Sequence, residues 1–171
     1  IEDAVQSAAA AQKQLISMPL AKRFDIIQAI RHTILDNNEH LARKALEETR
    51  IGRYEDKLQE NILCATKTPG PEDIRPETIT GDHGMMLLEY APVGVIGALC
   101  PITNPTGTFI HNSISMISAG NAVVFNAHPS ATQTSREMIR VIHRAIVQAG
   151  GPQGLITGIA EPTLKTAKEL I

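Results

Sequence analysis

Asn104 is the residue of this sequence whose type and setting best suit catalysis. It lies between two prolines, Pro101 and Pro105, directly after a short apolar run. Pro105 restricts the backbone of the residue before it, so the side-chain NH₂ group of Asn104 could be aimed rigidly at a developing oxyanion. Asn is also a favoured helix cap, and a helix that starts near Thr106 would give Asn104 a purely structural role. The residues alone leave both interpretations open.

Histidine and threonine side chains near this segment are further candidates. His128 follows a second apolar run and could face a ligand, although a single His beside Pro129 also suits a turn. The hydroxyl groups of Thr103 and Thr106 suit either a ligand contact or the start of a helix.

The two cysteines, Cys64 and Cys100, are too few for a disulfide scaffold or a zinc cluster, and we predict no metal site. Cys64 lies in the apolar stretch 62–65, where a free cysteine packs as a small apolar side chain. Cys100 ends an apolar run, but no basic residue lies close in the sequence to lower the pKa of its thiol. We therefore expect both cysteines to pack rather than to react.

Three short apolar runs are predicted to form parallel strands, and these strands would position the candidate residues at their ends. They span residues 93–100, 122–127 and 155–160, and helices are predicted over 106–118, over 130–149 and from Pro162 onward. This order favours right-handed crossovers and an α/β fold with half of a doubly wound parallel sheet. The last predicted helix has no stop signal before Ile171, so we expect a truncated chain, part of a longer protein.

Open α/β sheets bind ligands beyond the carboxyl ends of their strands, which here carry the segments 100–105 and 126–130. The Gly-x-Gly-x-x-Gly fingerprint is absent, and we expect Gly94 and Gly97, both inside the first strand, to let a helix pack closely. Neither turn contains Lys or Arg, so a dinucleotide pyrophosphate would have to rest on backbone N–H groups and helix N-termini.

The chain divides by charge and periodicity into three parts. Residues 1–67 contain 10 of the 16 Lys and Arg and 10 of the 18 Asp and Glu, and their spacing predicts an N-terminal helical layer with helices after Pro19, over 38–49 and over 54–65. Residues 68–92 are predicted to form a connector and a β-hairpin whose turn lies around 82–84. Residues 93–171 form the βαβαβα part, which should be largely buried because Glu89 is the one formal charge between positions 84 and 134.

Composition excludes several classes of protein. The 171 residues carry a net charge of −2 with a pI near 6.3, so we expect no nucleic-acid partner. No apolar run approaches the roughly 20 residues of a membrane span, so we expect no membrane partner either. The opening residues 1–3 lack the layout of a signal peptide, which favours a cytoplasmic location.

Three linked motifs, in this order, resemble the aldehyde dehydrogenase superfamily. They are residues 89–98 (EYAPVGVIGA), 101–106 (PITNPT) and 119–130 (AGNAVVFNAHPS). The T-N-P-T turn and the F-N-x-H-P segment are similar to the CoA-acylating branch, which includes the propionaldehyde and acetaldehyde dehydrogenases of bacterial microcompartments. The resemblance covers essentially the whole chain and likens it to the N-terminal part of such an enzyme.

This resemblance implies an oxidoreductase that converts an aldehyde, NAD and CoA to an acyl-CoA and NADH. In this family a cysteine thiolate attacks the aldehyde, a hydride passes to the nicotinamide, and CoA takes the acyl group. Asn104 matches the family's asparagine whose side-chain amide stabilises the oxyanion. By the same matching, the nucleotide-binding wall comprises Ile102, Thr103, Asn126, Ala127, His128 and Pro129.

Two departures from the family pattern matter. Asn126 stands where the hydrolytic aldehyde dehydrogenases have a lysine, which fits the acylating branch and, without a nearby cation for a 2′-phosphate, favours NAD over NADP. The family's catalytic cysteine lies well downstream, and neither Cys64 nor Cys100 matches it. The chain alone is therefore expected to be inactive.

The resemblance also implies a cytoplasmic homo-oligomer, or one enclosed in a bacterial microcompartment, whose strands over 78–90 extend toward partner subunits. Two alternatives remain. One is the aldehyde dehydrogenase half of a bifunctional aldehyde-alcohol dehydrogenase, which has a similar T-N-P-T turn. The other is a non-catalytic fragment that acts in assembly through its amphipathic opening, residues 2–15, although such a stretch is more often an ordinary core-facing helix.

Overall fold

A three-stranded parallel sheet stands at the centre of the fold. A computed structural model of the chain describes residues 1–171. Strands β3 (Val95–Leu99), β4 (Ala122–Asn126) and β5 (Ile156–Gly158) pair in that order, all in parallel, with Leu99 opposite Asn126. The middle strand β4 is buried along its whole length, which explains its uncharged sequence AVVFN. The predicted α/β class with a parallel sheet is confirmed, and each strand is shorter than its apolar run.

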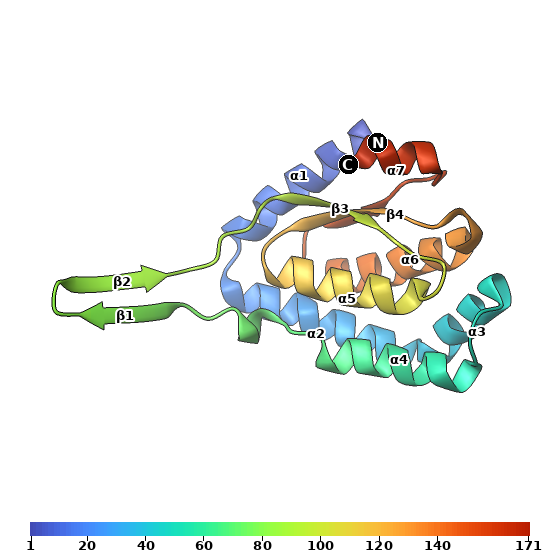
Figure 1. Cartoon of the computed structure of the whole chain (residues 1–171), viewed down its shortest axis with the longest axis horizontal. Coiled ribbons are helices and arrows are strands. Elements are labelled where there is room, and N and C mark those ends of the chain that lie inside the picture. Colours follow the sequence, from blue (N-terminus) through green and yellow to red (C-terminus); the bar gives the residue numbers. More distant parts are fainter.

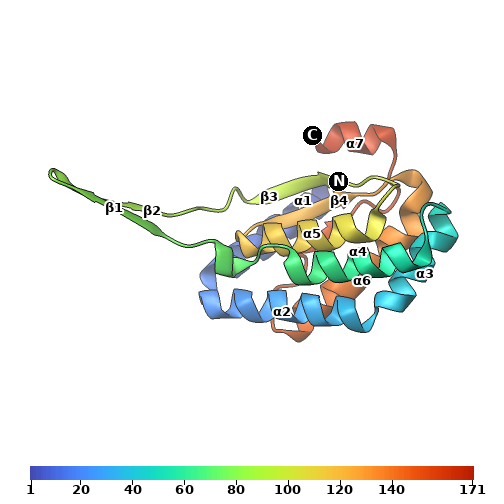
Figure 2. The ribbon, with the colours of Figure 1, turned by 60° about the horizontal axis from the view of Figure 1, so that its bottom comes forward.

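Helices cover both faces of this sheet. The crossover helices α5 (Pro105–Ser118) and α6 (Thr132–Gln148) lie on one face, whereas α1 (Glu2–Ser17) and α7 (Leu164–Leu170) lie on the other (Figure 1 and Figure 2). A short 3₁₀ turn, Pro129–Ala131, precedes α6 where the sequence predicts helix from residue 130. The chain therefore alternates strand and helix from β3 to α7, as its apolar periodicity predicts.

The opening helix α1 packs against the sheet. Its small and apolar residues Ala8, Ala11 and Leu15 are buried, and Gln12 donates a hydrogen bond to the carbonyl oxygen of Gly120 at 3.0 Å. The ordinary core-facing interpretation of this amphipathic stretch is confirmed.

Three further helices form an outer layer on the side of α5 and α6 that faces away from the sheet (Figure 1). They are α2 (Leu20–Asp36), α3 (Asn38–Thr49) and α4 (Tyr54–Lys67), close to the predicted ranges. Isoleucines spaced by one, three and four positions along α2 are fully buried and belong to the same core as the sheet residues. This core includes the stacked pair Phe109 and Phe125, with ring centroids 4.2 Å apart. The outer helices and the sheet thus share one hydrophobic core.

A β-hairpin projects from the body of the molecule (Figure 1). After a 3₁₀ turn at Pro71–Asp73, strands β1 (Glu77–Gly81) and β2 (Gly84–Leu88) pair in antiparallel register. Every residue of the two strands is exposed. The predicted hairpin is confirmed, and it presents apolar side chains to solvent. No helix of the chain is long and apolar enough to cross a bilayer.

A carboxylate from α3 caps the start of α6. Glu48 accepts hydrogen bonds from the backbone N–H groups of Gln133 at 2.8 Å and Thr134 at 2.6 Å, and from the hydroxyl of Thr134 at 2.6 Å. The positive end of a helix dipole attracts such a charge, so this contact ties the outer layer to the crossover helix.

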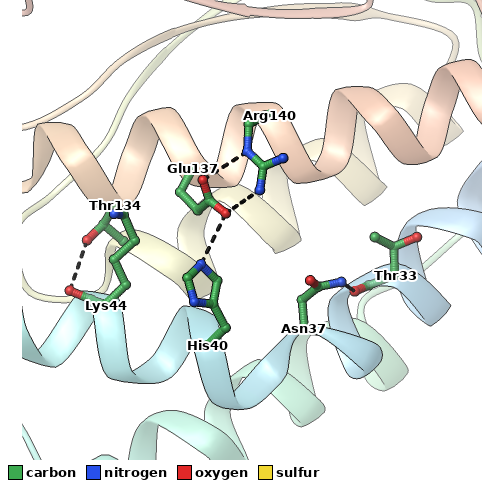
Figure 3. Close-up of polar contacts among 7 residues, drawn as sticks. All are labelled: Thr33, Asn37, His40, Lys44, Thr134, Glu137 and Arg140. Atoms are coloured by element: carbon green, nitrogen blue, oxygen red, sulfur yellow. Dashed lines mark hydrogen bonds and ion pairs between the residues drawn. The ribbon is translucent and has the colours of Figure 1, made fainter.

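Further along the same two helices, Glu137 of α6 joins a polar cluster shown in Figure 3. Its carboxylate lies 2.6 Å from Arg140 Nη2 on the same helix and 3.1 Å from His40 Nε2 on α3. Asn37, at the junction of α2 and α3, donates to the carbonyl oxygen of Thr33 at 2.7 Å. The hydrogen bond from Arg140, with a further contribution from His40, lowers the pKa of Glu137 to about 2.

This depressed pKa gives a pH-dependent contribution to stability. Because the carboxylate is favoured in the folded state, its contribution is complete above the ordinary carboxyl pKa and is lost as pH falls toward the folded value of about 2. We expect Glu137→Gln to destabilise the chain by about 1 kcal/mol at pH 7, since Arg140 and His40 are largely exposed and solvent screens them. Urea unfolding at pH 7 and pH 3 measures this. The difference between variant and wild type should shrink at pH 3, and an equal difference at both pH values would contradict the account.

Candidate functional site

The carboxyl edge of the sheet brings the predicted candidate segments together. Leu99 pairs with Asn126 at the ends of β3 and β4, and the backbone N–H of Cys100 donates to the carbonyl oxygen of Asn126 at 3.0 Å. The turn that leads to Asn104 and the turn that contains His128 therefore leave the same edge, where open α/β sheets bind ligands.

Asn104 caps α5. Its Oδ1 accepts a hydrogen bond from the backbone N–H of Gly107 at 3.0 Å, and its Nδ2 donates to Oε1 of Glu60 on α4. The capping interpretation is thus confirmed. The cap uses only Oδ1 of the amide. The NH₂ group has two N–H bonds, one of which donates to Glu60, so the second N–H can still donate to a ligand. The cap and the oxyanion interpretation are therefore compatible in one conformation.

Gly107 permits this conformation. A Cβ atom at position 107 would lie 2.6 Å from Nδ2 and 2.8 Å from Oδ1 of Asn104, far inside van der Waals contact. The sequence analysis missed Gly107, although its position three residues after a predicted cap was a usable signal. It also missed Glu60, for which no local signal exists, because Glu60 lies 44 residues before Asn104 and reaches it only through the packing of α4 beside α5.

Asn126 ends β4 in a buried position and faces α7. Its Oδ1 lies 2.7 Å from Oγ1 of Thr166, and Thr166 in turn forms a reciprocal cap with Thr163 at the start of that helix. Asn126 Nδ2 has only a long contact of 3.5 Å to the carbonyl oxygen of Ala127. The amide therefore retains donor capacity on the sheet edge. No hydrogen bond joins it to Asn104, whose side chain turns toward the opposite layer.

The side chain of His128 forms a hydrogen bond within its own turn. Its Nδ1 accepts a hydrogen bond from the backbone N–H of Ser130 at 3.1 Å, so the turn interpretation is confirmed. This contact places the proton of a neutral ring on Nε2, which can donate to a ligand. Of the other residues expected on the nucleotide wall, Ala127 is buried, Pro129 and Thr103 are exposed, and Ile102 is half-buried.

The start of α6 is poorly suited to the pyrophosphate contact expected at helix N-termini. Glu48 occupies the N–H groups of Gln133 and Thr134, and its negative charge would repel a phosphate there. The first turn of α5 is likewise capped, by Asn104.

Both cysteines behave as packing residues. Cys100 is buried, and this burial raises the pKa of its thiol to about 12. Burial, followed by the charge of Glu60, also raises the pKa of the half-buried Cys64. A thiol with a raised pKa is a poor nucleophile at neutral pH, so neither residue is suited to attack an aldehyde.

The two glycines near β3 differ from each other. A Cβ at Gly97 would lie 3.0 Å from Cγ of Leu170 on α7, which confirms that Gly97 lets a helix pack closely. Gly94 lies before the strand, has φ +116° and would meet nothing within 4 Å. The packing interpretation of Gly94 is wrong, because this glycine serves a left-handed turn.

Comparisons with known proteins agree on one family. The model of the aldehyde dehydrogenase family matches residues 1–171. An acetaldehyde dehydrogenase (acetylating) of Bilophila wadsworthia is 46% identical over 170 residues, which are 99% of this chain and 35% of the relative. The chain therefore spans about a third of the length of the curated relatives it matches.

Solved structures give the same result. The propionaldehyde dehydrogenase of Rhodopseudomonas palustris with bound propionyl-CoA is 42% identical with a TM-score of 0.95, over 98% of this chain and 38% of that one. A propionaldehyde dehydrogenase from the fucose utilisation microcompartment of Clostridium phytofermentans is 42% identical with a TM-score of 0.94, again over 98% and 38% of the two chains. The chain thus belongs to the aldehyde dehydrogenase family, and its relatives include CoA-acylating members.

Proposed function

We propose that residues 1–171 are the N-terminal, cofactor-binding part of an NAD-dependent CoA-acylating aldehyde dehydrogenase, which converts an aldehyde, NAD and CoA to an acyl-CoA and NADH. The observation that carries the proposal is the setting of Asn104, whose amide is fixed at the carboxyl edge of the sheet with one N–H to spare. The acylating relatives, matched over nearly the whole chain, support this reaction. We refer to the polypeptide that contains residues 1–171 together with the catalytic cysteine as the complete enzyme.

In this proposal Asn104 acts as an oxyanion donor. Its remaining Nδ2–H donates to the aldehyde oxygen as negative charge develops there. Because the amide is already oriented by the cap, this hydrogen bond needs no reorganisation at the moment of reaction. The nucleophile is a cysteine outside residues 1–171, since burial disfavours the thiolates of Cys64 and Cys100.

The nucleotide wall in this proposal comprises Ile102, Thr103, Asn126, Ala127, His128 and Pro129. The donor capacity of Asn126 Nδ2 and of His128 Nε2 suits ribose hydroxyl groups, and the half-buried Ile102 offers an apolar surface. When bound there, NAD supplies the hydride acceptor. The lack of Lys and Arg on these turns favours NAD over NADP.

One assay tests the proposed function. The complete enzyme is incubated with acetaldehyde or propanal and NAD, with and without CoA, and NADH and the thioester are quantified. We expect NADH and acyl-CoA in equal amounts, with turnover that depends on CoA. Release of a free carboxylate at the same rate without CoA would contradict the acylating reaction, and the isolated chain should produce no NADH.

The proposal includes a homo-oligomer in the cytoplasm or in a bacterial microcompartment, the setting of the Clostridium phytofermentans relative. The exposed apolar side chains of the hairpin are the structural argument for an oligomer. Ile79 and Met86 pair on one face of the hairpin, with Leu88 two residues further along, and all three are 43–60% exposed. Contiguous exposed apolar side chains of this kind mark an interaction surface.

A charged residue introduced on this face of the hairpin tests whether the hairpin contributes to the oligomer. We expect Met86→Lys to shift the complete enzyme to smaller species in sedimentation velocity, because a buried lysine without a partner opposes association. Gln59→Lys, at an exposed position of α4 outside the hairpin, is the control and should leave the mass unchanged. An unchanged mass for Met86→Lys would contradict this role of the hairpin.

A further inference from the structure

Glu60 meets the NH₂ end of Asn104. The amide is therefore held at both ends, by the backbone N–H of Gly107 on Oδ1 and by the carboxylate of Glu60 on Nδ2. The terminal torsion of Asn is broad, so a cap at Oδ1 alone leaves the amide plane free to rock. A second contact at the opposite end fixes that plane and thus the direction of the remaining Nδ2–H.

The helix that carries Glu60 is anchored at the same turn. Asn61, the next residue, is fully buried and donates to Oδ1 of Asn38 on α3 at 3.0 Å. Asn38 in turn donates to the carbonyl oxygen of Leu58 at 3.1 Å. This buried pair locks α4 against α3, so Glu60 is presented from a rigid support rather than from a mobile surface.

Glu60 has no competing partner. It takes part in none of the six ion pairs of the chain, and its side chain forms no hydrogen bond besides that with Asn104. Its side chain also lines an open groove of about 510 Å³ on α4, together with Asp56, Gln59 and Leu63. The carboxylate is thus directed to Asn104 and not consumed in a salt bridge.

We propose that Glu60 is a positioning residue that orients the side-chain amide of Asn104 toward the aldehyde oxygen. The inference rests on the proposed function, because it requires Asn104 to act as the oxyanion donor. The useful property of Glu60 is its acceptor oxygen and not its charge, since a carboxylate near a developing oxyanion repels it. A neutral acceptor of the same length should therefore serve equally well.

Steady-state kinetics of the complete enzyme with acetaldehyde, NAD and CoA test this role. We expect Glu60→Ala to lower kcat about tenfold while the KM for the aldehyde changes less than about threefold, because misorientation affects the transition state and not substrate binding. Glu60→Gln, which keeps the acceptor, should restore kcat to at least about a third of the wild-type value. Gln59→Ala, at the exposed neighbouring position, is the matched control and should leave kcat unchanged.

A double-mutant cycle separates this inference from the function on which it rests. In an Asn104→Ala background, Glu60→Ala should change kcat less than about twofold, because the residue through which it acts is gone. A full tenfold loss in that background, an unchanged kcat for Glu60→Ala alone, or a Gln variant as slow as the Ala variant would overturn the positioning role. An unchanged kcat for Asn104→Ala would instead overturn the role of Asn104 as oxyanion donor, and a complete enzyme that forms no acyl-CoA and NADH would overturn the proposed function itself.

Discussion

Asn104→Ala is expected to lower the kcat of the complete enzyme by about a hundredfold or more, the usual cost of removing one oxyanion donor. The same change removes the cap of α5, so the chain should also lose about 1 kcal/mol of folding stability. Stopped-flow or steady-state measurement of NADH formation gives the first value, and urea unfolding gives the second.

Asn104→Ser separates the two roles. Serine is as good a helix cap as asparagine but has no NH₂ group, so the Ser variant should keep near wild-type stability while kcat falls as in the Ala variant. A Ser variant with wild-type kcat would show that Asn104 is only a cap.

Arg31→Met is expected to destabilise the chain by about 3 kcal/mol, because the guanidinium serves several buried acceptors at once. Arg31 is buried on α2 and donates from Nη2 to the carbonyl oxygen of Thr68 at 2.8 Å and from Nη1 to that of Ala65. Its Nη2 also lies 3.3 Å from a carboxylate oxygen of Glu72. Methionine fills a similar volume but leaves both carbonyl groups without a partner.

Urea unfolding of the two proteins measures this loss. Arg144→Met, at an exposed position of α6 that takes part in no side-chain hydrogen bond or ion pair of the chain, is the matched control and should change stability by less than about 0.5 kcal/mol. Equal losses for the two variants would contradict the structural role of Arg31.

Periodicity predicted most of the elements because each carries its own signal. The apolar run at β4 is uncharged because both faces of the strand are covered, and the isoleucines of α2 recur at helical spacing because one face joins the core. The position of α1 has no such signal. Its small residues suit any close packing surface, and only the folded chain places them on the sheet face opposite α5.

The hydrogen bonds of the candidate residues were predicted where both partners lie close together in the sequence. The cap at Asn104 and the turn at His128 depend on residues two or three positions away. The contacts Asn104 with Glu60, Asn126 with Thr166 and Glu48 with the start of α6 join residues 40 to 86 positions apart. Such pairs arise from helix packing, which a single sequence does not encode in any short motif.

The most direct test of the account is to locate the acyl group on the complete enzyme. The enzyme is incubated with propanal and NAD without CoA, so that the thioester accumulates, and is then digested and mapped by mass spectrometry. We predict a propionyl adduct on a cysteine outside residues 1–171, released by added CoA. An adduct on Cys64 or Cys100 would contradict the proposal that this chain binds the cofactor and stabilises the oxyanion but does not supply the nucleophile.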